Sequence, residues 1–180
     1  MADGTTNKED AASPQPPKST DATHTKATAD LNLNRQAEAE TPKPKRFFFY
    51  GSLMDPDVLY AIARTSATKP ELQRATIRGF RMKKWGCYPT IVPAGAGDII
   101  HGVYWEAENE GQLALLQRYE THRYKPDTCA IHVEKDGIVI DDGLTFVWAG
   151  DPGSKELEDG EFSLEEYQLY YKPDTFKRTS

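Results

Sequence analysis

The aromatic residues of this chain are distributed very unevenly. All seven Phe, nine Tyr and three Trp residues lie in residues 47–180, and residues 1–46 contain none. A packed core needs large apolar side chains, because their burial offsets the conformational entropy lost on folding. Any folded domain must therefore be built from the region that starts near residue 46. We expect this domain to cover residues 46–175.

The N-terminal segment has the composition of a disordered region. Residues 1–46 are rich in Thr, Ala, Pro, Lys and Glu, and their seven Lys/Arg balance their seven Asp/Glu. A segment with so little apolar surface to bury stays disordered. A transit peptide is the alternative, but such peptides are poor in acidic residues. We therefore expect residues 1–45 to form a disordered N-terminal tail.

The remaining composition excludes several classes of protein. No apolar run approaches the roughly 18 residues of a membrane span, and no basic block typical of nucleic-acid binding accompanies the net charge of −6. The N-terminus, MADGTTNKED, lacks the apolar stretch of a secretory signal. Cys87, Cys129 and the four histidines have no metal-ligand spacing. These features predict a cytoplasmic protein with two reduced thiols and no metal or cofactor, whose partner is neither nucleic acid nor membrane.

The order of the predicted elements indicates an α+β fold. Strands are expected at residues 46–50, 75–85, 98–107, 129–133, 138–140 and 144–150, and helices at residues 56–64, 108–120 and from about residue 163. Strands mostly follow strands, which favours a mixed or antiparallel sheet, including one closed into a small barrel. In the last helix, Tyr167, Tyr170 and Tyr171 fall at helical spacing, and we interpret them as packing residues.

Two Asp-Gly pairs lie between apolar stretches in the second half of the domain. Asp136-Gly137 precedes the short run IVI, and Asp142-Gly143 follows it. Asp-Gly is typical of tight hairpin turns, because both positions of such a turn require positive φ. We predict a turn at each pair.

The stretch FFFYGSLMDP changes from an apolar strand to a small polar loop within two residues. A strand that ends at Tyr50, a helix that starts at Pro56 and a Gly-Ser loop between them leave backbone N–H groups without partners. Such groups suit a carboxylate or phosphate ligand. The alternative is an ordinary connection in which Gly51 supplies a permissive backbone. Ser52 lacks the GxSxG context of a nucleophile, and we do not expect it to be one.

Glu120 is a second candidate functional residue. It ends the predicted helix of residues 108–120, on or beside the apolar face. A carboxyl drawn into an apolar pocket has its pKa raised towards neutrality, where it can accept and donate protons. The alternative is a solvated acid at a frayed helix end.

Four sequence blocks occur in the order and spacing of the gamma-glutamylcyclotransferase-like family. They are FFFYGSLMDPDVL, IRGFRMKKWGCYPTIVP, IIHGVYWEA and LLQRYETHRYKPDTCAIHV. Over about residues 46–150 the chain resembles in particular the branch that includes plant proteins induced by avirulence genes. The resemblance implies a compact α+β fold on a small mixed barrel. It also implies an acyltransferase that cyclises a γ-glutamyl amide to 5-oxoproline and releases the free amine.

The resemblance also implies roles for individual residues. The substrate-binding loop of the family matches Tyr50, Gly51, Ser52, Leu53, Met54 and Asp55. The catalytic acid of the family matches Glu120. The chain departs from the family at Gln117, where Asp is usual, and at Thr121, where Gly is usual.

The implied reaction is consistent with the motifs that the chain lacks. The α-amine of the substrate attacks its own γ-carbonyl, so the enzyme needs no nucleophile, metal or cofactor, only a base such as Glu120. A γ-glutamyl compound is then the expected small-molecule partner. A non-catalytic binding module of the same fold, holding a carboxylate-bearing small ligand, is the alternative, and the departures at Gln117 and Thr121 support it.

Overall fold

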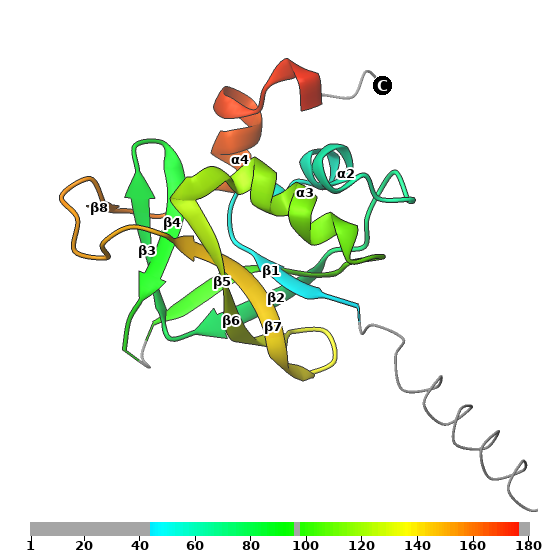
Figure 1. The fold of residues 1–180 in the computed structure, drawn as a ribbon, viewed down its shortest axis with the longest axis horizontal. Coiled ribbons are helices and arrows are strands. Elements are labelled where there is room, and N and C mark those ends of the chain that lie inside the picture. Colours follow the sequence, from blue (N-terminus) through cyan, green and yellow to red (C-terminus); the bar gives the residue numbers. More distant parts are fainter. Residues whose placement is uncertain (1–43, 96–97, 177–180) are drawn as a thin grey trace, which may run out of the picture. The chain divides into compact units, whose positions relative to one another are not determined.

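The computed structural model describes residues 44–95 and 98–176 (Figure 1). The predicted disordered tail, residues 1–45, lies outside the described residues except for its last two positions. The regular elements run from Arg46 to Phe176. None of the helices in this described part is long and apolar enough to cross a membrane.

Five strands close into a barrel. They are β1 (Arg46–Phe49), β2 (Gln73–Arg78), β5 (Ile99–Glu106), β6 (Tyr124–Val133) and β7 (Val139–Trp148), in the order β1-β5-β2-β6-β7. Strand β1 runs parallel to β7, and the other neighbours are antiparallel. The predicted α+β fold with a small mixed barrel is confirmed.

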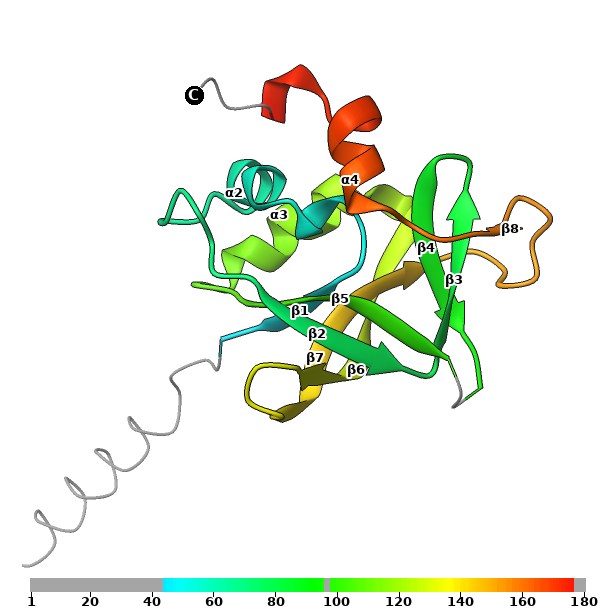
Figure 2. The ribbon, with the colours of Figure 1, turned by 180° about the vertical axis from the view of Figure 1, so that it is seen from behind.

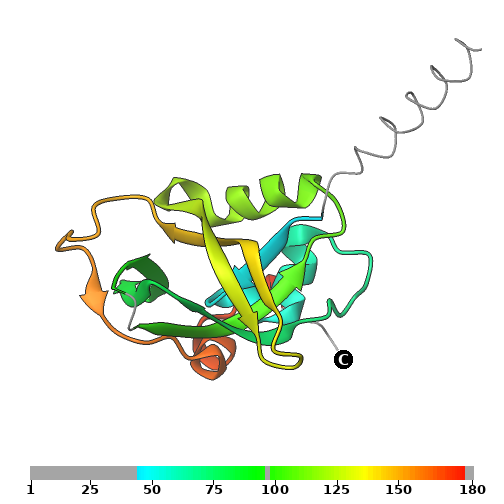
Figure 3. The same cartoon turned by 90° about the horizontal axis from the view of Figure 1, so that it is seen from below.

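A second sheet and several helices surround the barrel. The sheet has the order β4-β3-β8, from β3 (Phe80–Trp85), β4 (Tyr88–Pro93) and β8 (Glu158–Asp159). The helices are η1 (Ser52–Met54), α2 (Pro56–Ala63), α3 (Gly111–Glu120), η2 (Thr121–Arg123), α4 (Leu164–Glu166), η3 (Tyr167–Tyr171) and η4 (Asp174–Phe176). Figures 1 and 2 show α2, α3 and the C-terminal segment on the side of the barrel away from the β6–β7 hairpin. Figure 3 shows the second sheet and β8 beside the barrel.

Strand β1 is apolar at every position after Arg46 because both of its faces are buried. Phe48 belongs to a cluster that receives side chains from all five barrel strands, which is the barrel interior. Phe47 and Phe49 point the other way, into a second cluster with Leu59 of α2 and Leu116 of α3. A strand buried on both faces needs a continuous apolar run rather than alternation. Strand β1 therefore ties the barrel to its helical layer.

Two details of the predicted elements are wrong. The expected strand of residues 75–85 is two strands, β2 and β3, because Gly79 breaks it with a φ of 87°. Asp136-Gly137 is a turn as predicted, but Asp142-Gly143 lies inside β7. A Cβ at Gly143 would collide with the Ile131 side chain, so this glycine provides space at the β-bulge of β6 and not a turn. The last helix forms where it was predicted, as α4 followed directly by the π-helical turn η3.

Candidate functional site

A cavity of about 670 Å³ opens at the end of the barrel where β1 stops. Its walls come from the end of β1 with η1, the junction of α3, η2 and β6, the β3–β4 hairpin and the C-terminal segment. Among the residues singled out from the sequence, Tyr50, Gly51, Ser52, Leu53 and Glu120 line it. Met54 and Asp55 are not among the lining residues. Two segments about 70 residues apart in the sequence thus share one cavity.

The Tyr50–Leu53 turn presents backbone N–H groups to this region. Met54 N–H donates to Gly51 O at 2.9 Å and Asp55 N–H to Ser52 O at 3.0 Å. The N–H groups of Ser52 and Leu53 precede these bonds, so they have no partner within the turn. Gly51 has a φ of −126°, which other residues also adopt. What favours glycine here is space, because a Cβ would lie 3.0 Å from Pro89 Cγ.

Glu120 is the last residue of α3, and its side chain is half-buried in the cavity wall. Burial raises the pKa of its carboxyl to about 8, and no cation or hydrogen-bond donor in the described part of the chain offsets this effect. A carboxyl can be reached from the cavity and still be surrounded by protein, which is why moderate exposure and a raised pKa coexist here. Such a group exchanges protons close to neutral pH.

Three tyrosine hydroxyls surround this carboxyl. Burial raises the pKa of Tyr50, Tyr119 and Tyr124, and the charge of Glu120 adds to the shift in each case. The hydroxyl of Tyr50 donates to Phe146 O at 2.6 Å, and that of Tyr124 donates to Pro89 O at 2.9 Å. These bonds fix two walls of the cavity through β7 and β4.

The Tyr50–Leu53 turn and α3 are connected directly. Ser52 Oγ and the Tyr119 hydroxyl are 2.9 Å apart and share a hydrogen bond. Tyr167, from the C-terminal segment, is close enough to both groups for them to influence its pKa. The hydroxyl of Ser52 therefore positions α3 relative to the turn, and Glu120 is the next residue after Tyr119.

Asp55 has a structural role in the described chain. Its carboxylate caps α2 by accepting from the N–H groups of Asp57 (2.9 Å) and Val58 (3.2 Å), and it is only 1% exposed. It also accepts from Lys172 Nζ at 2.9 Å and from Gln168 Nε2 at 2.8 Å. Burial alone would raise its pKa, but these hydrogen bonds lower it below its usual value. A substrate contact from Met54 or Asp55 stays a prediction.

The C-terminal segment forms a wall of the cavity that the sequence did not reveal. Phe162, Tyr167, Tyr171 and Phe176 all line the cavity. The interpretation of the tyrosines as packing residues is wrong for Tyr170 and Tyr171, which are 76% and 58% exposed. The helix expected from about residue 163 does begin there, and Ser163 Oγ caps it by accepting from Glu166 N–H. Nothing in the local sequence indicates that it returns to cover η1 and α2.

The backbone after Glu120 is strained. Thr121 has a φ of 62° and a ψ of −170°, a region populated almost entirely by glycine. Its hydroxyl accepts from Arg123 N–H at 3.3 Å, which supports the tight turn of η2. The glycine that is usual at this position in the resembling family is therefore explained by backbone geometry. Thr121 adopts the same kind of turn at a cost in stability.

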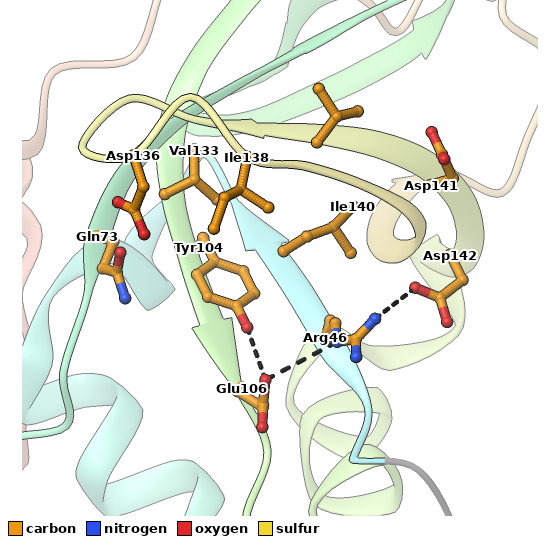
Figure 4. Close-up of a pocket in the computed structure, with 11 residues that line it drawn as sticks. Arg46, Gln73, Tyr104, Glu106, Val133, Asp136, Ile138, Ile140, Asp141 and Asp142 are labelled. Atoms are coloured by element: carbon orange, nitrogen blue, oxygen red, sulfur yellow. Dashed lines mark hydrogen bonds and ion pairs between the residues drawn. The ribbon is translucent and has the colours of Figure 1, made fainter.

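A second cavity, of about 580 Å³, lies at the opposite end of the barrel, where β1 begins and β6 ends. Figure 4 shows Arg46 between two carboxylates, those of Glu106 and Asp142. Arg46 Nη1 donates to Asp142 Oδ1 at 2.8 Å, and the Tyr104 hydroxyl donates to Glu106 Oε2 at 2.7 Å. Burial and Glu106 raise the pKa of Tyr104 to about 12.

Known proteins resemble this chain across most of its folded part. The family model described as gamma-glutamyl cyclotransferase, AIG2-like matches residues 47–168. AIG2-like protein A of Arabidopsis thaliana is 30% identical over 136 residues, which cover 73% of this chain and 78% of the relative. AIG2-like protein C of the same plant is 28% identical over 133 residues, covering 71% of each.

Solved structures share the fold. A solution structure of a protein from Arabidopsis thaliana has a TM-score of 0.54 and 27% identity, covering 73% of this chain and 85% of its own. An AIG2-like protein from Mus musculus has a TM-score of 0.50 and 16% identity, covering 73% and 97%, and shows likeness of fold alone. The resemblance noted from the sequence blocks is confirmed. The chain belongs to the gamma-glutamyl cyclotransferase, AIG2-like family.

Proposed function

We propose that this protein is a γ-glutamyl cyclotransferase that converts a γ-glutamyl amide to 5-oxoproline and a free amine. One observation carries the proposal: a carboxyl with a pKa raised to about 8, that of Glu120, lines the same cavity as the Tyr50–Leu53 turn. Membership of a family that includes γ-glutamyl cyclotransferases supports it. Glu120 is the general acid/base, and Tyr50 to Leu53 form the substrate-binding turn.

The raised pKa of Glu120 suits the proton transfers that this reaction requires. The substrate enters with a protonated α-amine, whose pKa is about 8. Glu120 accepts one proton from this group, and the freed nitrogen attacks the γ-carbonyl carbon to form the ring C–N bond. Glu120 returns this proton to the leaving nitrogen as the amide C–N bond breaks. It then takes the second proton from the ring nitrogen and passes it to the released amine, which leaves as an ammonium ion. Because donor and acceptor have similar pKa values, the proton moves in either direction at little cost.

Orientation supplies the second part of the rate acceleration. A well-oriented intramolecular reaction reaches an effective molarity of roughly 10⁵–10⁸ M. The N–H groups of Ser52 and Leu53, which have no partner within the turn, are suited to hold the α-carboxylate of the substrate or the oxyanion that develops at its carbonyl. The hydrogen bond between Ser52 and Tyr119 fixes the position of this turn relative to Glu120.

Replacing Glu120 by Gln tests the proposal. Gln is nearly isosteric but cannot accept a proton, so release of 5-oxoproline from γ-glutamyl amides should fall by roughly 10²–10⁴-fold. Circular dichroism should be unchanged, and calorimetry should still detect binding of the amide. Unchanged turnover in Glu120→Gln would remove Glu120 from the mechanism. Wild-type protein that binds the amides without releasing 5-oxoproline would instead be a binding module.

A further inference from the structure

The cavity has two chemically different halves. One half holds Glu120 and the Tyr50–Leu53 turn, which together suit a γ-glutamyl group. The other half is aromatic, with Trp85 and Tyr88 on the β3–β4 hairpin and Tyr171 and Phe176 on the C-terminal segment. The aromatic half has no part in the proton transfers proposed above.

The aromatic half extends from the neighbourhood of Glu120 to the surface. The ring of Phe176 packs edge-on against Tyr119, with centroids 6.5 Å apart. The rings of Trp85 and Tyr88 stack at 5.8 Å. Tyr88 and Tyr171 are 57% and 58% exposed although they line the cavity. Exposed apolar side chains gathered around a cavity mark a binding surface.

The guanidinium that lines the cavity is already engaged. Arg123 is the one lysine or arginine among the described lining residues. Its guanidinium lies 4.7 Å from the centre of the Trp85 ring and pairs with Glu156 Oε2 at 3.6 Å. A ligand portion that carries a carboxylate would therefore have to displace an existing ion pair, whereas an uncharged ring would not.

The volume of the cavity exceeds what a γ-glutamyl group needs. At about 670 Å³ it lies in the range of roughly 300–1,000 Å³ typical of sites for drug-sized ligands, whereas a glutamyl group is a single small amino acid. We propose that the aromatic half binds the amine portion of the substrate, and that this portion is a large, uncharged, aromatic or alkyl group. The inference rests on the proposed function and specifies its substrate class.

Two matched substrates test the inference, γ-glutamyl-phenethylamide and γ-glutamyl-ethylamide. Both release a primary alkylamine, so the chemical step is similar and only the ring differs. A single methylene group in an apolar pocket changes kcat/KM by roughly 10–200-fold. We therefore expect kcat/KM to be at least about tenfold higher for the phenethylamide. A ratio near one would overturn the inference.

A pair of neighbouring tyrosines provides a matched control. Tyr171→Ala should lower the phenethylamide-to-ethylamide ratio severalfold, because Tyr171 lines the cavity. Tyr170→Ala should leave the ratio unchanged, because Tyr170 is 76% exposed and does not line it. Equal effects of the two substitutions would also overturn the inference.

Binding to the Glu120→Gln variant separates this inference from the proposed function. If wild-type protein turns over neither amide, the proposed function fails. Calorimetry with Glu120→Gln then decides the inference alone. Tighter binding of the phenethylamide than of the ethylamide, by about tenfold, would support it, and equal binding would overturn it.

Discussion

The two ends of the barrel hold cavities of similar size but opposite character. The cavity where β1 begins has Glu106 hydrogen-bonded by Tyr104 and Asp142 paired with Arg46, and both carboxylates are open to solvent. The cavity where β1 ends holds Glu120, whose carboxyl is enclosed by protein and has no compensating partner in the described chain. Burial without a compensating partner raises the pKa of a carboxyl group, whereas an ion pair that is open to solvent does not raise it. The two cavities have similar volumes, so it is the environment of the carboxyl group, and not the volume, that supports the proposed site at the end where β1 stops.

Matched substitutions at the two ends should give the largest contrast. Glu120→Gln should reduce 5-oxoproline release by roughly 10²–10⁴-fold, because it removes the proposed proton carrier. Glu106→Gln, an identical chemical change at the charged end, should leave turnover unchanged. The same product assay measures both. A comparable loss in Glu106→Gln would show that the two cavities are not functionally distinct.

The ion pairs at the two ends should differ in their contribution to stability. Lys172 pairs with Asp55, and their side chains are 8% and 1% exposed. Lys172→Ala leaves the buried Asp55 carboxylate without its cationic partner, so it should lower the free energy of unfolding by about 3 kcal/mol. Asp142→Asn breaks a pair whose acid is 65% exposed, and should cost less than about 1 kcal/mol. Urea denaturation compares the two; equal losses would contradict the burial argument.

The pH dependence of stability should also distinguish the ends. The pKa of Glu120 is raised from 4.5 to about 8 by folding, so the folded state keeps a proton that the unfolded state has lost over this range. Wild-type stability should therefore decrease as the pH rises from 5 to 8. Gln does not titrate, so Glu120→Gln should become more stable than wild type, by on the order of 2 kcal/mol at pH 8 after allowance for partial exposure. Denaturation at pH 5 and pH 8 measures this. A difference between variant and wild type that does not change with pH would contradict the raised pKa.

The strained backbone beside Glu120 should give the smallest effect. Thr121→Gly relieves a φ of 62° combined with a ψ of −170°, and should raise the free energy of unfolding by about 1 kcal/mol after the entropy cost of glycine. Arg64 also has positive φ, at 52°, but in the ordinary left-handed region, so Arg64→Gly should stabilise less. Thermal denaturation of the two variants tests the difference. A destabilised Thr121→Gly would mean that the bond from Arg123 N–H outweighs the strain.

Local sequence patterns predicted much of the fold, because the burial of a strand and the capping of a helix depend on residues that are close together in the chain. The continuous apolar run of Phe47, Phe48 and Phe49 indicated a fully buried strand, and the structure places it between two clusters. Asp55 before Pro56 indicated the start of α2, and its carboxylate does cap that helix. The Asp142-Gly143 pair failed as a turn signal because a glycine also relieves crowding, here against Ile131. The same residue type answers two different physical needs, and the sequence does not distinguish them.

The contacts of the C-terminal segment could not be read from local patterns. Lys172 and Asp55 are 117 residues apart, and neither has a neighbour in the sequence that indicates the other. Their ion pair lies in the segment that brings Tyr171 to the cavity, whereas helical spacing alone had suggested that this tyrosine is a packing residue. When the partner of a residue is distant in the sequence, only the tertiary fold brings the two together and shows what the residue does.

The sequence by itself determined the α+β class and made the Tyr50–Leu53 turn and Glu120 candidate functional residues, because composition, capping and short motifs depend on residues close together in the chain. Only the tertiary structure decided that the turn and Glu120 share one cavity, that Glu120 is enclosed enough to have a raised pKa, and that an aromatic wall covers them. Closure of the barrel and return of the C-terminal segment bring these groups together. Burial, which raises the pKa and excludes water, is a property of that assembly and not of any single segment.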